Sequence, residues 1–214
     1  MKKLLFLPLV LVLAVGAHAQ SDKFVGAMKK NIDLLDSAFR DLATMQSLAN
    51  NFERIANAEK NQWLAYYYAA YCQINSGYID KDKSKTDSYA DKAASLIARA
   101  DSLSPKNSEI SCIKSMIASL HMMVNPMQRY MQYGQEIQTE MENAMEQDPS
   151  NPRPYLLKGQ GLRYTPEQFG GGCATAKPEL QKAADLFSAF KPASEIHPNW
   201  GKQRTAQLLG ECSK

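Results

Sequence analysis

Residues 93–105, AASLIARADSLSP, and residues 137–149, IQTEMENAMEQDP, share one spacing that decides the fold. In both stretches apolar or small residues and a closing proline are separated by 4, 3 and 5 positions: Ala93, Ile97, Ala100 and Pro105, and Ile137, Met141, Ala144 and Pro149. Steps of three and four place side chains on one face of a helix. The residue before a proline is pushed out of the α region. Each stretch therefore predicts a helix that approaches a partner through small residues and ends just before its proline.

The same 3.6-residue period runs through most of the chain. Near the beginning, Phe24, Met28, Ile32 and Leu35 follow steps of 4, 4 and 3, which again place them on one helical face. Alternation with period two is rare, and runs of β-branched residues are absent. The sequence predicts an all-α protein, with loops at 75–87 and 165–172.

The pattern resembles the tetratricopeptide repeat (TPR), in which small residues and a proline recur at these offsets in the second helix. The first helix of a TPR also has a small residue where Ser115 and Gly159 stand, ten positions after Pro105 and Pro149. The resemblance covers roughly residues 60–190 and, more faintly, 24–58. It implies an irregular TPR-like α-solenoid of about four antiparallel helix pairs, closed by a C-terminal capping helix.

The N-terminus predicts a secretory signal peptide at residues 1–19. Lys2 and Lys3 precede an apolar run from Leu4 to Val15, and Ala17-His18-Ala19 forms a cleavage pattern. This run is shorter than the roughly 20 residues that span a bilayer, and no later segment is predicted to span one. We expect cleavage after Ala19, a single domain at 20–214, and a periplasmic or secreted location.

Charge and residue counts argue against several kinds of function. The formal charge of the whole chain is +3, and two of its lysines lie in the predicted signal peptide, so a nucleic-acid partner is not expected. His121 and His197 are the histidines outside that peptide. They are too few for a histidine-based metal site or a catalytic triad. The sequence predicts no enzyme, no metal site and no cofactor.

The stretch Gly170-Gly171-Gly172-Cys173 lacks the Lys-Ser/Thr pair and the preceding strand of a phosphate-binding loop. We expect these glycines to form a tight reversal before a helix, with Pro178 near its first turn. Cys173 begins that helix and Cys212 lies near the end of the last, so a disulfide between them is predicted. Adjacent first helices of a TPR-like stack also allow a bridge between Cys72 and Cys112, and this alternative stays open.

Methionines cluster at positions 122, 123, 127 and 131, next to His121. Thioether ligands suit Cu(I), but methionine more commonly fills irregular helical cores. We therefore interpret this cluster as core.

The TPR resemblance implies a concave groove lined by the first helix of each pair. It places Tyr67, Tyr71, Met116, Arg153, Gln160 and Arg163 there. Aromatic and arginine side chains are suitable anchors for a protein or peptide partner. The main prediction is thus an exported scaffold that binds such a partner through an open groove, without catalysis. The alternative is a periplasmic small-molecule or metal-binding component associated with solute uptake, which predicts an enclosed pocket instead.

Overall fold

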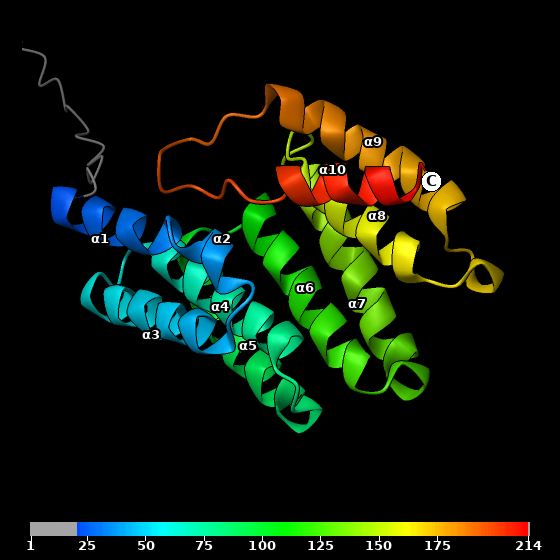
Figure 1. Cartoon of the computed structure of the whole chain (residues 1–214). Helices are drawn as coiled ribbons and strands as arrows, with labels where there is room; N and C mark the ends of the chain where they lie inside the picture. The colour runs from blue at the N-terminus through cyan, green and yellow to red at the C-terminus, as the bar shows by residue number, and fades with distance from the viewer. Residues whose placement is uncertain (1–20, 214) are drawn as a thin grey trace, which may run out of the picture.

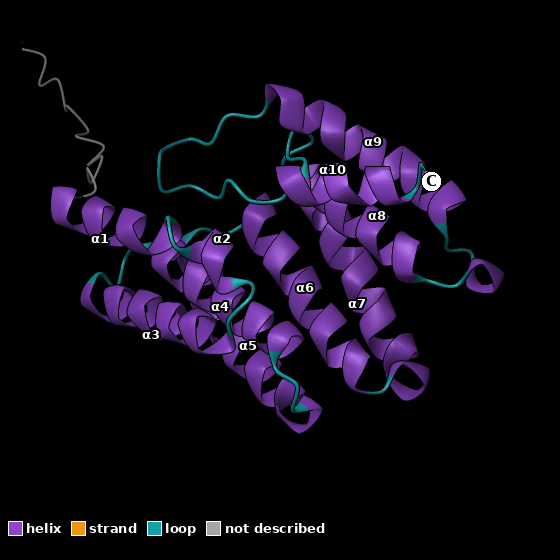
Figure 2. Ribbon diagram, viewed as in Figure 1, coloured by secondary structure: helices purple, strands orange, loops and turns teal. Residues whose placement is uncertain are grey.

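The computed structural model describes residues 21–213, and the predicted signal peptide lies outside this range. The described residues form helices joined by loops, with no strand among them (Figure 2). The helices are α1 (Asp22–Ile32), α2 (Leu35–Ala38), α3 (Leu42–Ala58), α4 (Trp63–Ile79), α5 (Thr86–Leu103), α6 (Ser108–Val124), α7 (Pro126–Gln147), α8 (Arg153–Tyr164), α9 (Cys173–Ala189) and α10 (Lys202–Glu211). The predicted all-α class is confirmed.

Consecutive helices pack side by side as an array of pairs (Figure 1). The most extensive contacts join α3 to α4, α4 to α5, α6 to α7, and α8 to α9. At one end α1 and α2 lie on α3, and at the other α10 packs on α9 and α8. No helix within residues 21–213 is both long and apolar enough to cross a membrane.

Small residues sit where the sequence predicts close helix packing. Ala93, Ala100 and Ala144 are fully buried. At Gly159 in α8, an added Cβ would lie 2.7 Å from Cγ of Leu180 in α9, closer than packed carbon atoms allow. The small residues therefore set how closely the helices of each pair approach.

Helix starts follow ordinary capping chemistry. The side chains of Asp41, Asn107 and Asn125 each accept a hydrogen bond from a backbone N–H in the first turn of α3, α6 and α7. Such caps satisfy donors that have no partner within the helix. Pro126 follows its cap at the first position of α7, where its missing N–H costs nothing.

The predicted loop at 75–87 begins too early, because α4 continues to Ile79. Gly77 lies inside this helix, where an added Cβ would meet Cδ2 of Leu120 at 2.8 Å. The polar residues Asn75 and Ser76 bond to backbone carbonyls four residues earlier. Close packing against α6 thus keeps a stretch helical that reads as a loop in sequence.

The glycine reversal and its disulfide are present as predicted. Gly170 and Gly172 have φ of 82° and 91°, which favours glycine. The predicted disulfide joins Cys173 to Cys212, with 5.2 Å between their Cα atoms. Pro178 lies inside α9, just past its first turn, because the helix begins as early as Cys173.

Candidate functional site

The groove predicted to be open is covered by residues 190–201, which connect α9 to α10. Tyr67 and Tyr71 of α4 are only 0% and 4% exposed. The Trp200 ring stacks on Tyr71 at 5.2 Å between centroids, and its Nε1 donates a hydrogen bond to the Tyr67 hydroxyl at 2.8 Å. The TPR resemblance implies a C-terminal helix that caps the end of the array. The connecting segment before that helix reaches further, to the middle of the array.

Arg153, at the start of α8, holds this connecting segment in place. Its Nη2 donates to the carbonyl oxygen of Pro198 at 2.6 Å, and its Nη1 lies 2.9 Å from Oε1 of Glu109. The guanidinium carbon also lies 4.7 Å and 5.1 Å from the ring centroids of Phe190 and Trp200. Burial raises the pKa of Glu109, and the charge of Arg153 opposes that shift. Arg153 is fully buried, so its cation contacts its own chain rather than solvent.

The remaining groove residues lie apart from these. Arg204 of α10 donates to Oε1 of Gln160 at 2.9 Å. Arg163 is half-buried one turn further along α8, and Met116 of α6 is 9% exposed. The structure therefore brings Tyr67, Tyr71 and Arg153 together beneath the connecting segment, and it places Gln160 beside α10.

A pocket of about 450 Å³ opens between the N-terminal helices, α4 and the connecting segment. Its walls are mostly apolar and aromatic, with polar residues among them: Ile32, Asp33, Leu35, Asp36, Phe39, Tyr68, Tyr71, Asn199 and Trp200. We call this the aromatic pocket. Phe39 meets the Tyr71 ring edge-on at 6.3 Å. The volume of the pocket lies within the range of small-molecule sites.

Tyr68 and Tyr71 are the two tyrosines buried in the wall of this pocket, and Tyr68 is the more deeply buried. Tyr68 is 1% exposed, and its hydroxyl has no hydrogen-bond partner among the described residues. Burial raises its pKa, so the hydroxyl keeps its proton and remains a donor. Of the two carboxylates in the lining, Asp33 is paired with Lys29 at 2.8 Å.

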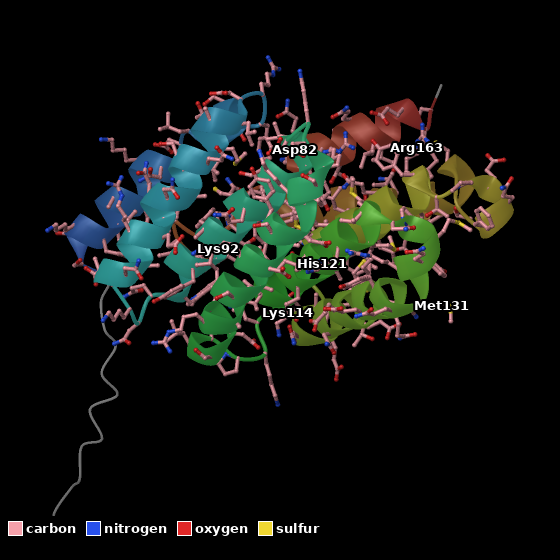
Figure 3. The ribbon with its side chains drawn as sticks, turned by 90° about the horizontal axis from the view of Figure 1, so that it is seen from below. Asp82, Lys92, Lys114, His121, Met131 and Arg163 are labelled. Atoms are coloured by element: carbon pink, nitrogen blue, oxygen red, sulfur yellow. A yellow bond between two sulfur atoms is a disulfide. The ribbon has the colours of Figure 1, made fainter. Side chains whose placement is uncertain are left out.

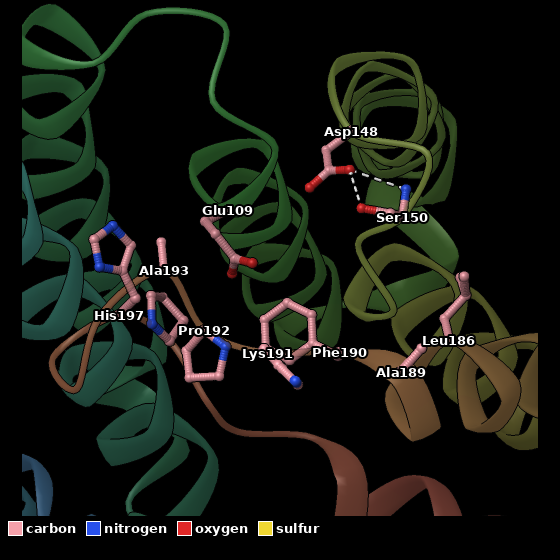
Figure 4. Close-up of a pocket in the computed structure, with 11 residues that line it drawn as sticks. Glu109, Asp148, Ser150, Leu186, Ala189, Phe190, Lys191, Pro192, Ala193 and His197 are labelled. Carbon is pink, nitrogen blue, oxygen red and sulfur yellow. Dashed lines mark hydrogen bonds between the residues drawn. The ribbon is translucent and has the colours of Figure 1, made fainter.

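A second cavity, of about 330 Å³, lies on the other side of the connecting segment (Figure 4). His197, Phe190 and Glu109 line it. Burial lowers the pKa of His197, and its Nδ1 lies 2.7 Å from the Ser194 hydroxyl. Glu109 already bonds to Tyr67 and Arg153. Asp148 and Ser150 in its wall bond to each other, and Lys191 also lines it.

An exposed apolar surface lies on the first turns of α7, away from both cavities. Met127, Tyr130 and Met131 are 90%, 65% and 84% exposed, and Met131 projects from the edge of the molecule (Figure 3). The interpretation of these methionines as core is wrong for Met123, Met127 and Met131, because the last turn of α6 and the first turns of α7 leave these side chains facing solvent. No group of three or more His, Cys, Asp or Glu side chains in residues 21–213 is placed to hold a metal ion.

The alternative bridge between Cys72 and Cys112 does not form. Both cysteines are buried free thiols, and burial raises the pKa of each. Their inward position on α4 and α6 makes them part of the packing.

Sequence reasoning missed Leu35, Phe39 and Trp200 as pocket residues. Leu35 is predicted only as part of an apolar helical face. Phe39 lies at the C-terminus of the short helix α2, outside any periodic run. No spacing in the sequence places these three residues together.

Comparison with solved structures finds the HusA haemophore from Porphyromonas gingivalis. The match has a TM-score of 0.79 and 37% sequence identity, and it covers 91% of this chain and 94% of HusA. No family model matches the chain, and no curated protein matches it. The predicted scaffold for a protein partner is contradicted by this relative, whose description is that of a haemophore. The small-molecule alternative fits better, and the burial of Tyr67, Tyr71 and Arg153 agrees with it.

Proposed function

Because this chain belongs to the family of the HusA haemophore, we propose that it is an exported haem-binding protein without catalytic activity. The observation that carries the proposal is the 37% identity over nearly the whole of both chains. The disulfide supports export, because such bonds persist in oxidising compartments. The buried small residues at the helix contacts support a TPR-like origin of the pairs.

The aromatic pocket is the haem site in this proposal. A porphyrin is a flat apolar ring, and the side chains of Phe39, Tyr71 and Trp200 offer aromatic surfaces to such a ring. The lining contains no histidine, methionine or cysteine, and the donor atoms that it would offer to iron are the oxygens of its aspartates, tyrosines and asparagine. The residues present thus fit recognition of the ring through apolar contact.

The test is a haem titration of the mature chain, followed by visible absorption. We expect saturable binding, and we expect Phe39→Ala to weaken it about 3- to 10-fold because one aromatic contact with the ring is lost. Phe39 is 38% exposed at the rim of the pocket, so its removal leaves the fold intact.

Phe169→Ala is the matched control, because Phe169 is 70% exposed at the turn between α8 and α9. It should bind haem as the unaltered protein does. Absence of saturable binding to the unaltered protein would disprove the function. Equal affinity of the two alanine variants would place the site elsewhere.

A further inference from the structure

The aromatic pocket carries a negative charge that its own lining does not neutralise. Asp33 and Asp36 are its carboxylates, and the lining contains no lysine, arginine or histidine. Both carboxylate oxygens of Asp33 accept from Nζ of Lys29, at 3.0 and 2.8 Å. Asp36 forms no hydrogen bond or ion pair within residues 21–213. The charge of Asp36 is therefore the unpaired one that a bound molecule meets.

The two carboxylates lie at the rim of the pocket, above buried rings. Tyr68 and Tyr71 are 1% and 4% exposed, whereas Asp33 is 59% exposed and Asp36 is exposed as well. Burial raises the pKa of the Tyr71 hydroxyl, and the charge of Asp36 adds to this rise. The charge of Asp36 thus reaches the deep part of the pocket.

A carboxylate carried into this pocket would find no cation there. The neutral donors of Asn199 and Trp200 line it, and Trp200 already donates to Tyr67. Burying an unpaired charge is costly, and the like charge of Asp36 adds to that cost. A ligand should therefore enter by an edge that carries no carboxylate.

We propose that the aromatic pocket receives a porphyrin by an uncharged edge, and that Asp36 selects against porphyrins whose carboxylates are spread around the ring. This inference rests on the proposed function. Haem meets the condition, because its carboxylates lie side by side on one edge and can extend past the rim into water. The ligand class is thus a planar tetrapyrrole with one apolar edge.

The test uses fluorescence titration with two metal-free rings, protoporphyrin and coproporphyrin. Protoporphyrin has the carboxylates of haem on one edge, whereas coproporphyrin has a carboxylate on every pyrrole ring. Since neither contains iron, a bond from Asp36 to iron cannot affect the comparison. The unaltered protein should bind protoporphyrin at least about 10-fold more tightly than coproporphyrin, because coproporphyrin must bury a carboxylate.

The titrations separate failure of the inference from failure of the function. Equal affinity for the two rings would overturn the inference, while saturable haem binding would leave the function intact. Binding of haem but of neither metal-free ring would also overturn it, because iron rather than the ring edge would then direct binding. Absence of saturable haem binding would instead reject the function.

Variants of Asp36 test the selecting charge, and its exposed, unpaired side chain can be replaced without loss of the fold. Asp36→Asn should raise coproporphyrin affinity about 2- to 5-fold, and Asp36→Lys should raise it further. Affinity for protoporphyrin should change less. A gain of equal size for both rings would overturn the inference, because Asp36 would then not distinguish where the carboxylates lie.

Asp22→Asn and Asp22→Lys are the matched controls, because they change the net charge equally. Asp22 begins α1 and does not line the pocket, so these variants should keep the preference of the unaltered protein. The gain in Asp36→Asn should also shrink in about 1 M salt, which shortens the screening length to roughly 3 Å. The same gain in the Asp22 variants, or one that high salt leaves undiminished, would overturn the inference.

Discussion

Arg153 shows how one residue determines whether the concave side is open. In sequence it reads as a surface anchor at the start of a helix. In the structure it is fully buried and binds Glu109, the Pro198 carbonyl and two aromatic rings. A buried guanidinium needs its charge paired and its donors bonded. Nη1 and Nη2 of Arg153 are bonded, and Nε has no partner among the described residues. Here the connecting segment supplies much of that satisfaction, so the cation stabilises the covered form.

Asp87 makes the free energy of unfolding depend on pH in the acid range. Hydrogen bonds from Arg129 at 2.5 and 2.8 Å, with His121 at 2.9 Å, hold the pKa of this carboxyl at about 2, below its usual value near 4. A carboxyl whose pKa is lower in the folded state than in the unfolded state stabilises the fold at pH values above the unfolded-state pKa. This stabilisation is lost as the pH falls through the folded-state pKa. The loss should therefore fall between about pH 4 and pH 2.

Asp87→Asn should lack this acid-dependent contribution. Since the side chain is 38% exposed, solvent screening reduces it to roughly 1 kcal/mol. Urea unfolding at a series of pH values measures it. Asp91→Asn, four residues later on the same helix and 75% exposed, should keep the profile of the unaltered protein. Parallel profiles for the unaltered protein and Asp87→Asn between pH 4 and pH 2 would contradict the prediction.

At the scale of elements, the α9–α10 end depends on a covalent tie. The disulfide closes a loop with a sequence separation of 39 residues, and this loop includes the connecting segment. Replacing Cys173 and Cys212 by serine should lower the free energy of unfolding by about 3–4 kcal/mol, because the unfolded chain regains freedom. Denaturant unfolding measures the loss. Cys72→Ser is not a suitable control, because that thiol is buried in the core and its replacement would itself change the stability.

Reduction of the unaltered protein is the better control. It should reproduce the stability of the double serine variant and leave that variant unchanged. If reduction has no effect on the unaltered protein, the bridge does not contribute as described.

The elements themselves could be predicted, because each is encoded locally. Steps of three and four predicted the helices, and Gly170–Gly172 predicted the reversal. The loop prediction was wrong for the residues of α4 after Ile74, because asparagine, serine and glycine usually favour loops. Their helical state is set by packing against Leu120, which is distant in sequence.

The candidate site could be predicted only in part, because it forms between distant segments. The TPR resemblance named Tyr71 as a groove residue, and the structure places Tyr71 in the wall of the aromatic pocket. The resemblance could not show that Trp200 lies on Tyr71, because no repeat spacing encodes that contact. The unpaired hydroxyl of Tyr68 could not be predicted from the sequence either, because it depends on which hydrogen-bonding groups the folded chain places near it.

At the scale of the whole molecule, Trp200 couples the two ends of the array. In a simple solenoid each repeat contacts its neighbours alone, so damage stays local. Here Trp200→Ala should destabilise the protein by about 3 kcal/mol and speed amide hydrogen exchange in α4. Leu209→Ala, which trims the smaller core beneath α10, should affect exchange in α8–α10 and leave α4 protected. Unchanged α4 exchange in Trp200→Ala would show that the ends are independent.

The contact between Trp200 and Tyr67 spans 133 positions of sequence, and this separation affects the order of the folding steps. The helix pairs are local structures that can form as the chain emerges. The concave side of α4 stays uncovered until the last residues have been made and have folded back. Folding should thus proceed as rapid local pairing followed by a slow final docking step, during which two buried tyrosines and a lone cationic arginine face water.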